Sequence, residues 1–365
     1  MIKDIIVTVP KLNLPGGVSA FWNALLPEFH KMDNVHFRTL EIGGHGKNVL
    51  GPLIDIWKLR KATKTTTDLL VLNPSLGSRS FFRDAFFAKY LIRNNIPFVV
   101  FFHGWNLQFQ ERIDKKYISF FQNSLGKAKK IFVLSSDFKE KLLAWGYQGE
   151  VVIATTTVDA KLFKKNRALK EDNFNQDPLK ILFLSRLIKG KGIYETIKAF
   201  ENLRNDQLNV QLIIAGSGEE SENIKSLVEH NDNIILTGHV VGQEKIELYK
   251  DCTLYCLPSY SEGLPTSVLE AMSFGKPVIT TPVGGLKSFF QDGVMGFFVQ
   301  PKDSDDLEAK LRILLKHQDL RKKIGAYNFN YAHQHLMSDK VAKNMFEEIK
   351  LFLKLKTTKV SLSAT

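Results

Sequence analysis

The strongest constraint on the fold is a repeated alternation of short apolar runs with longer amphipathic segments. The apolar runs of the first half are DIIVTV, HFRTLEI, DLLVLN, PFVVFFHG and KIFVLSS. Those of the second half are LKILFLS, VQLIIAG, NIILTG, LYCLPS, KPVITT and GFFVQ. The segments between them, such as 18–31, 79–94 and 112–128, have helical spacing. Near-continuous apolar strands alternating with helices are typical of parallel sheets. The sequence therefore predicts an α/β protein in which each half forms a doubly wound, Rossmann-like domain.

The length of the chain and one polar segment predict two domains. The chain has 365 residues, more than a single hydrophobic core usually supports. The stretch KKNRALKEDNFNQDP has almost no apolar periodicity and is the best linker candidate. We expect an N-terminal domain over 1–165, a linker over 166–178, a second domain over 179–340, and a C-terminal helix over 341–365 that returns toward the first domain. Ligands of open α/β sheets bind beyond the carboxyl ends of the strands, so two such domains facing each other predict a cleft.

Composition narrows the class of protein. With 44% hydrophobic and 24% charged residues, the chain resembles an ordinary globular protein. The longest apolar run, residues 96–102, is too short to cross a bilayer. The start, MIKDIIVTVP, suits a first buried strand better than a secretory signal, so we expect a cytoplasmic protein. Cys252 and Cys256 are expected to be core thiols, because a structural zinc site would need four ligands.

The positive charge is concentrated in the first half of the chain. The net charge is +12, and residues 1–165 carry 24 Lys and Arg against 13 Asp and Glu, whereas residues 166–365 carry 26 against 25. Such asymmetry suggests that the first half faces an anionic partner, such as a membrane surface, a lipid phosphate or nucleic acid. The alternative is a solvated basic surface without a partner.

Three loops have suggestive chemistry. In PGGV, Gly16 and Gly17 follow the first strand and open a helix, where free amides could receive a phosphate, although a glycine pair is also typical of a plain turn. In SRLIKGKG, Arg186 and Lys191 lie between a strand and a helix, which suits a diphosphate or simply two exposed cations. AGSGEE resembles half of a dinucleotide fingerprint, but Ser221 replaces its third glycine and the expected later acid is absent. A nicotinamide site is therefore disfavoured. The sequence contains no GxxxxGK[ST] motif of a P-loop ATPase.

The stretch SYSEGLPTSVLEAMSFGKPVITTPVGG carries the most specific pattern in the chain. Glu262 lies in a Gly-Pro loop after an apolar strand, and Glu270 lies in the early turns of the following helix, which Thr266 or Ser267 could cap. Both acids would then lie at the same end of a sheet. A carboxylate accepts two hydrogen bonds in parallel, which suits the paired hydroxyls of a ribose or a sugar. The alternative, that both acids only complement a helix dipole, explains one acid but not the arrangement.

These residues resemble a known family. The chain is similar to retaining glycosyltransferases of the GT-B type, which have two Rossmann-like domains facing across a cleft, and in particular to the large glycosyltransferase group 4 family. The resemblance extends from the first strand to about Leu315. It depends most on the spacing of Glu262 and Glu270, followed by GKPVITTPVGG and DGVMGFFVQPKDSDDL.

The resemblance implies a role for each matching residue. It places Glu270 on the ribose and Glu262 on the hydroxyls of the donor sugar, with backbone contacts from Gly263, Leu264 and Pro265. It places a diphosphate on Arg186 and Lys191, and it matches Gly16 and Gly17 to an N-terminal glycine loop. His103 in FFHG matches a histidine beside the donor sugar, whereas the residue alone would suggest a core or capping histidine.

The implied activity is that of a retaining hexosyltransferase without a cofactor. It would move a sugar from a UDP- or GDP-sugar to a growing glycan, such as a lipid-linked surface polysaccharide or lipopolysaccharide. Arg186 and Lys191 would stabilise charge on the leaving diphosphate, which itself guides the acceptor hydroxyl. We expect no metal, because the acids of Asp303-Ser304-Asp305 precede a helix that they would cap. The alternative is a catalytically inactive partner subunit that binds nucleotide sugars.

The basic first half is expected to contact an anionic membrane surface peripherally, and not nucleic acid. The charges assigned to this contact are Arg79, Arg83, Lys89, Arg93, Arg112, Lys115, Lys116, Lys127, Lys129 and Lys130. The phenylalanines among them, Phe81, Phe82, Phe86 and Phe87, are expected to pack mainly into the core at helical spacing.

Overall fold

The computed structural model describes residues 2–14, 16–45, 50–65, 67–163, 177–203 and 208–353. The chain divides into two compact units. Unit 1 comprises Met1–Val133, Phe138–Ala154 and Val341–Thr365, and unit 2 comprises Leu134–Asp137 and Thr155–Lys340. The predicted linker over 166–178 lies outside the described residues except for Asp177 and Pro178.

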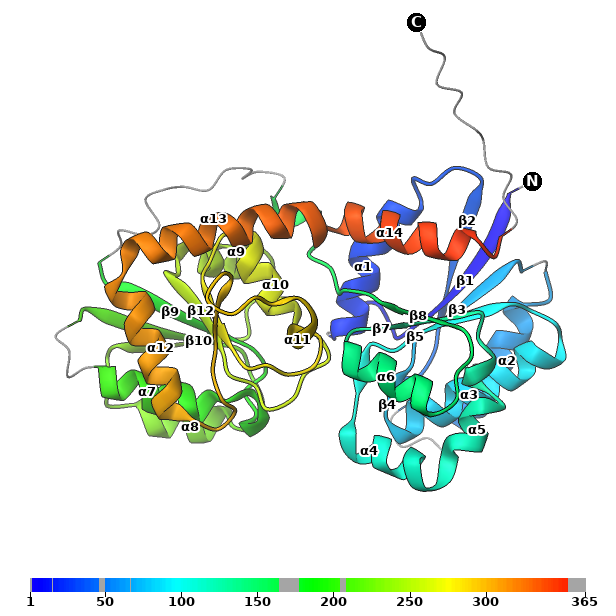
Figure 1. The fold of residues 1–365 in the computed structure, drawn as a ribbon, viewed down its shortest axis with the longest axis horizontal. Helices are drawn as coiled ribbons and strands as arrows, with labels where there is room; N and C mark the ends of the chain where they lie inside the picture. The colour runs from blue at the N-terminus through cyan, green and yellow to red at the C-terminus, as the bar shows by residue number, and fades with distance from the viewer. Residues whose placement is uncertain are drawn as a thin grey trace, which may run out of the picture. The chain divides into compact units, whose positions relative to one another are not determined.

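Unit 1 is built on a parallel six-stranded sheet (Figure 1). Its strands, in the spatial order β2-β1-β3-β5-β7-β8, are β2 (Val35–Glu41), β1 (Lys3–Val9), β3 (Leu69–Leu72), β5 (Phe98–Phe101), β7 (Lys130–Val133) and β8 (Glu150–Ile153). A two-stranded sheet pairs β4 (Ser75–Leu76) with β6 (Gly104–Trp105). Every predicted run of the first half contains a strand. The sequence reading missed β8, whose EVVI is short and starts with an exposed acid.

The helices of unit 1 follow the predicted pattern with one shift. They are α1 (Gly17–Phe29), α2 (Gly51–Ala62), α3 (Ser78–Arg93), α4 (Leu107–Arg112), α5 (Ile118–Gln122), α6 (Ser136–Ala144, shared between the units) and the part of α14 (Ser338–Lys350) from Val341 onward. The helix predicted over 112–128 begins earlier, because the Asn106 side chain accepts a hydrogen bond from the Phe109 amide and caps α4. A π-helical turn over Ile113–Tyr117 joins α4 to α5.

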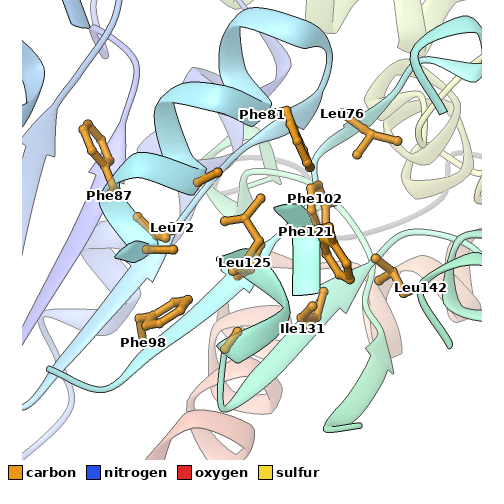
Figure 2. Packing of buried hydrophobic residues seen from close by; sticks show 14 of the residues in the cluster. Leu72, Leu76, Phe81, Phe87, Phe98, Phe102, Phe121, Leu125, Ile131 and Leu142 are labelled. Atoms are coloured by element: carbon orange, nitrogen blue, oxygen red, sulfur yellow. The ribbon is translucent and has the colours of Figure 1, made fainter. Parts of the chain in front are cut away.

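The core of unit 1 lies between the sheet and α3. Phe81 and Phe87 of α3 are fully buried, and they belong to a cluster that includes Leu72, Phe98 and Phe121 (Figure 2). Burying an aromatic side chain of this size stabilises the fold by about 1.5–3 kcal/mol. The expectation of core packing is therefore confirmed for Phe81 and Phe87, whereas Phe86 is 56% exposed.

One lysine assigned to membrane contact is buried instead. Lys130 is only 1% exposed, and its ammonium group pairs with Glu150 at 2.7 Å and with Glu348 of α14. A buried cation of this kind is held by its carboxylate partners and does not reach a lipid surface. Lys130 is therefore removed from the predicted basic surface, whereas Lys115, Lys116, Lys127 and Lys129 are exposed.

Unit 2 repeats the same architecture (Figure 1). Its parallel strands, in the spatial order β11-β10-β9-β12-β13-β14, are β11 (Ile234–Gly238), β10 (Val210–Ala215), β9 (Leu179–Leu184), β12 (Leu254–Leu257), β13 (Val278–Thr280) and β14 (Gly296–Phe298). Its helices are α7 (Ile193–Leu203), α8 (Ser221–Val228), α9 (Gly242–Asp251), α10 (Thr266–Ser273), α11 (Leu286–Phe289), α12 (Ser304–Lys316) and α13 (Gln318–His335). The prediction of two doubly wound parallel sheets is confirmed, and Cys252 and Cys256 are buried free thiols as expected.

Candidate active site

Glu262 lies in the loop between β12 and α10, at the carboxyl end of the unit 2 sheet. Its Oε1 atom accepts hydrogen bonds from the Lys191 ammonium group and from Ser259 Oγ, the latter at 2.7 Å. The Lys191 and Glu262 side chains are only 12% and 10% exposed, so this ion pair is shielded from screening by salt. The structure thus brings together two predicted site residues that are 71 positions apart in the chain.

Two glycine loops fix the backbone around Glu262. Gly192 follows Lys191 with φ at +74°, and a Cβ atom there would overlap the Pro258 carbonyl oxygen. Gly284 has φ at +54°, and a Cβ atom there would overlap the carbonyl oxygens of Glu262 and Gly263. Only glycine accommodates both the positive φ and the close approach. The loops that carry Lys191 and Glu262 are therefore locked together by backbone contact as well as by charge.

This packing gives a testable expectation for Gly284→Ala. The new methyl group must push the Glu262 loop away, so affinity for the nucleotide sugar that the sequence resemblance implies should fall at least tenfold by calorimetric titration. Gly293→Ala is the matched control, because Gly293 also has a positive φ, +74°, but has nothing within 4 Å of an added Cβ. Gly293→Ala should lose about 1 kcal/mol of stability from backbone strain. Gly284→Ala should lose more, because its methyl group also overlaps backbone oxygens. Equal donor affinity in the two variants would contradict the proposed packing role.

Glu270 is buried in α10 and satisfied by two side chains of α9. Lys245 Nζ donates to its Oε1 atom at 2.7 Å, and Tyr249 O–H donates to its Oε2 atom at 2.9 Å. Burial, followed by the nearby Glu270 charge, raises the pKa of Tyr249 well above its usual range, so this phenol remains a donor. A carboxylate has about four lone-pair positions, so both oxygens retain capacity for further hydroxyl donors.

The predicted cap of α10 is wrong. The residue before the helix is Pro265, and neither Thr266 nor Ser267 caps it with a side chain. Ser267 Oγ instead accepts a hydrogen bond from Tyr255 O–H at 2.7 Å. Proline is favoured at helix starts because it has no amide hydrogen to satisfy. The backbone amides of Gly263 and Leu264 form no hydrogen bond within the described part of the chain.

Arg186 lies on the loop after β9, and the AGSGEE loop supports that loop. The Leu187 amide donates to the Ser217 carbonyl at 3.0 Å, and the Glu220 amide donates to the Leu187 carbonyl at 3.0 Å. The glycine-rich stretch after β10 therefore holds the Arg186 loop in place, which accounts for its glycines without a dinucleotide. The Arg186 side chain is exposed and has no ion-pair partner within the described residues.

In unit 1, the predicted site residues Gly17 and His103 lie near a common helix. Gly16 precedes α1 and Gly17 opens it. The His103 ring, just after β5, packs against Phe21 of α1 with ring centroids 4.9 Å apart, and stacks on Phe101 at 4.0 Å. Both features lie at the carboxyl end of the unit 1 sheet, where ligands of such folds bind.

Asn73 determines which nitrogen of His103 carries the proton. The Asn73 amide nitrogen donates to the Thr8 carbonyl at 2.7 Å, so its Oδ1 atom faces His103 Nε2 at 2.9 Å. The imidazole must therefore donate from Nε2, and neutral imidazole has a single N–H. This leaves Nδ1 as a hydrogen-bond acceptor.

Burial lowers the pKa of His103 to about 3, so the ring is neutral at physiological pH. An unfolded chain would protonate this histidine below about pH 6.5 while the native state would not. Native stability should therefore decrease as the pH falls from about 7 toward 4. We expect His103→Gln to lose less thermal stability than the parent between pH 7.5 and 5.0 in scanning calorimetry. An identical loss in both proteins would contradict the neutral assignment.

In the part of the chain that the structure describes, no group of three or more His, Cys, Asp or Glu side chains is arranged to hold a metal ion. Asp303 caps α12 as expected, with its carboxylate accepting from the amides of Asp305 and Asp306 at 3.0 and 2.9 Å. No helix within the described ranges has the length and apolar character needed to cross a membrane.

Sequence reasoning missed several polar partners of the site. These are Lys245 and Tyr249 beside Glu270, Ser259 beside Glu262, and Asn73 beside His103. Lys245 and Tyr249 are four residues apart on α9, so helical spacing places both on one face. That spacing was the available signal, but it does not indicate which acid the two residues meet.

The two parallel six-stranded sheets have the arrangement of the GT-B fold. Residues 164–331, just under half of the chain, match the family model described as glycosyl transferases group 1. The fold is shared with a crystal structure of Anabaena HepE in complex with UDP and glucose. That structure is 15% identical with a TM-score of 0.72, and the match covers 96% of this chain and 100% of HepE.

Two curated relatives have named pathways or reactions. The putative teichuronic acid biosynthesis glycosyltransferase TuaC of Bacillus subtilis is 26% identical over 70% of this chain and 60% of its own length. The N,N'-diacetylbacillosaminyl-diphospho-undecaprenol alpha-1,3-N-acetylgalactosaminyltransferase of Campylobacter jejuni is 29% identical over 43% of this chain and 41% of its own length. The chain spans about half to three-fifths of the length of the first curated relatives that it matches.

Proposed function

We propose that this protein is a retaining glycosyltransferase that moves a sugar from a UDP- or GDP-sugar to a growing glycan. The observation that carries the proposal is the arrangement at the carboxyl end of the unit 2 sheet. There Lys191 is paired with Glu262, and the buried Glu270 keeps acceptor capacity. Cations for a diphosphate and acids for hydroxyls are the chemistry that a nucleotide sugar requires.

The donor would be held by groups that the fold positions in advance. Glu270 accepts the ribose hydroxyls, and the exposed Arg186 receives the diphosphate. Lys191 has three N–H donors, of which one goes to Glu262, leaving two for phosphate oxygens. Glu262 and the free amides of Gly263 and Leu264 contact the sugar.

The chemistry would proceed through charge stabilisation and needs no protein nucleophile. As the glycosidic bond breaks, negative charge grows on the leaving diphosphate, and Arg186 and Lys191 stabilise it. The leaving phosphate guides the acceptor hydroxyl onto the same face of the sugar, which retains the configuration. His103, neutral and accepting at Nδ1, would hold a hydroxyl of the donor sugar.

The proposed acceptor is a glycan carried on a lipid at the cytoplasmic surface of a membrane. The Campylobacter relative is named for an acceptor with a diphospho-undecaprenol group, and TuaC for teichuronic acid biosynthesis. The excess basic charge of residues 1–165 suits an anionic leaflet, where each exposed Lys or Arg contributes about 1 kcal/mol. The protein would therefore associate peripherally with the membrane.

The deciding experiment is a donor-hydrolysis and transfer assay with a panel of UDP- and GDP-sugars. We expect slow release of the nucleotide diphosphate from one donor and faster release with a lipid-linked acceptor. The alternative of an inactive partner subunit predicts thermal stabilisation by the nucleotide sugar without turnover. If no donor is turned over and no donor raises the melting temperature, both proposals are contradicted.

A further inference from the structure

Helix α2 exposes an unusually apolar outer face. Leu53 is 63% exposed, Trp57 is 61% exposed and Ile54 is 38% exposed. These three side chains have the spacing i, i+1 and i+4, so they share one side of the helix. Figure 1 shows α2 in unit 1 beside α3. Leaving three large apolar side chains in water on a single helix is unfavourable unless something covers them.

The opposite side of α2 fixes the helix on unit 1. Gly51, Asp55 and Leu59 are buried at four-residue spacing. Asp55 anchors the helix, because its carboxylate accepts from the Gly43 amide at 2.9 Å and contacts His45 Nε2 at 2.8 Å. The hydrogen bonds of Asp55 therefore fix the buried side of α2 to unit 1, so the apolar outer face stays exposed.

The exposed apolar side chains merge into a basic cluster at the end of α2. Arg60, Lys61 and Lys64 are exposed, and Lys61 Nζ lies 5.5 Å from the centre of the Trp57 ring. Asp55, which is buried, is the only acid in residues 50–65. The segment thus combines an exposed tryptophan, two aliphatic side chains and unneutralised cations.

We propose that the outer face of α2 inserts into the headgroup region of an anionic bilayer. Tryptophan favours the membrane interface, where its ring is in apolar surroundings and its N–H reaches water. Lysine and arginine next to such a face bind anionic headgroups, and this combination defines interfacial helices. The inference rests on the membrane contact in the proposed function, but it assigns that contact to residues 53–64 in place of the basic run over 79–130.

Trp57 supplies a direct readout in the unmodified protein. The chain has four tryptophans, and Trp22, Trp105 and Trp145 are all buried. A change in tryptophan emission on adding vesicles therefore reports on Trp57. With vesicles of phosphatidylcholine and phosphatidylglycerol we expect a blue shift, together with quenching by brominated acyl chains. With phosphatidylcholine alone we expect little change in emission, because these vesicles carry no net negative charge to attract the lysines and arginine.

Variants separate this face from other surfaces. Leu53→Glu with Ile54→Glu should weaken binding to anionic vesicles at least tenfold without lowering the melting temperature, because both side chains are exposed. Leu227→Glu is the matched control, since Leu227 is a 51% exposed leucine on α8 of unit 2, and it should bind as the parent does. Trp57→Phe should still co-sediment with vesicles but lose the emission change. Lys115→Glu with Lys116→Glu should reduce binding less than the α2 variant does.

Three results would overturn the proposal. Co-sedimentation without quenching of Trp57 would place the bilayer contact elsewhere and leave peripheral membrane association standing. If the protein does not bind anionic vesicles at low salt, the membrane contact is overturned altogether. The proposed glycosyltransferase activity is then still tested separately, by the donor assay with a soluble acceptor. A dimer in sedimentation velocity that Leu53→Glu converts to a monomer would show that a second copy covers this face.

Discussion

Arg186→Met and Lys191→Met are each expected to lower kcat by about 100- to 1,000-fold while changing the donor KM much less. Under the proposed mechanism, both cations meet charge that develops only as the diphosphate leaves, and an interaction made mainly in the transition state affects turnover. Steady-state kinetics with a saturating acceptor would measure both constants. A higher KM with unchanged kcat would show that the two residues bind the ground state and transition state equally.

The control for this pair lies on the same loop. Lys189 occupies the same short turn as Lys191, but its side chain is 73% exposed and lies 3.9 Å from Glu220. Lys189→Met removes an equal charge and should leave kcat within about twofold of the parent, since exposed ion pairs contribute about 0–1 kcal/mol. A loss as large as that of Lys191→Met would indicate a general effect of loop charge. Between the two active-site variants, Arg186→Met is the simpler, because Lys191→Met also leaves Glu262 without its cation.

Glu270→Ala is expected to weaken donor-nucleotide binding by at least tenfold. Charge-assisted hydrogen bonds contribute about 1.5–3 kcal/mol each, and a tenfold change in affinity corresponds to about 1.4 kcal/mol. Isothermal calorimetry with UDP and GDP would give the affinities directly. Unchanged affinity for both nucleotides would contradict the assignment of Glu270 to the ribose.

Loss of the buried carboxylate also affects its neighbours, so a second variant is needed. In Glu270→Ala the Lys245 ammonium group and the Tyr249 hydroxyl both lose their acceptor. Glu270→Gln retains one acceptor oxygen and the side-chain shape, so it should remain folded while its affinity for the nucleotide still decreases. Glu244→Gln, an exposed acid on α9, should leave affinity and melting temperature unchanged.

The sequence by itself determined the class of fold and the order of its parts. A strand buried on both faces needs an uninterrupted apolar run, and a covering helix needs an apolar stripe, so these patterns are local and readable. Such runs predicted eleven of the strands in the two six-stranded sheets. The weak case was β8, where an exposed acid and a short run left no clear pattern. The spacing of Glu262 and Glu270, with its glycines and proline, likewise placed both acids near one sheet edge.

Only the tertiary structure decided which side chains meet. The Lys191 and Glu262 pair depends on β9 and β12 being neighbours in the sheet, which no local pattern encodes. Lys130 reads as one more surface cation in a basic run, yet strand pairing and the end of α14 bury it between two carboxylates. Asp55 occupies the inward side of α2, which leaves the Trp57 indole at the surface. In each case the side chain's environment is created by residues distant in sequence, and burial and charge pairing are properties of that environment.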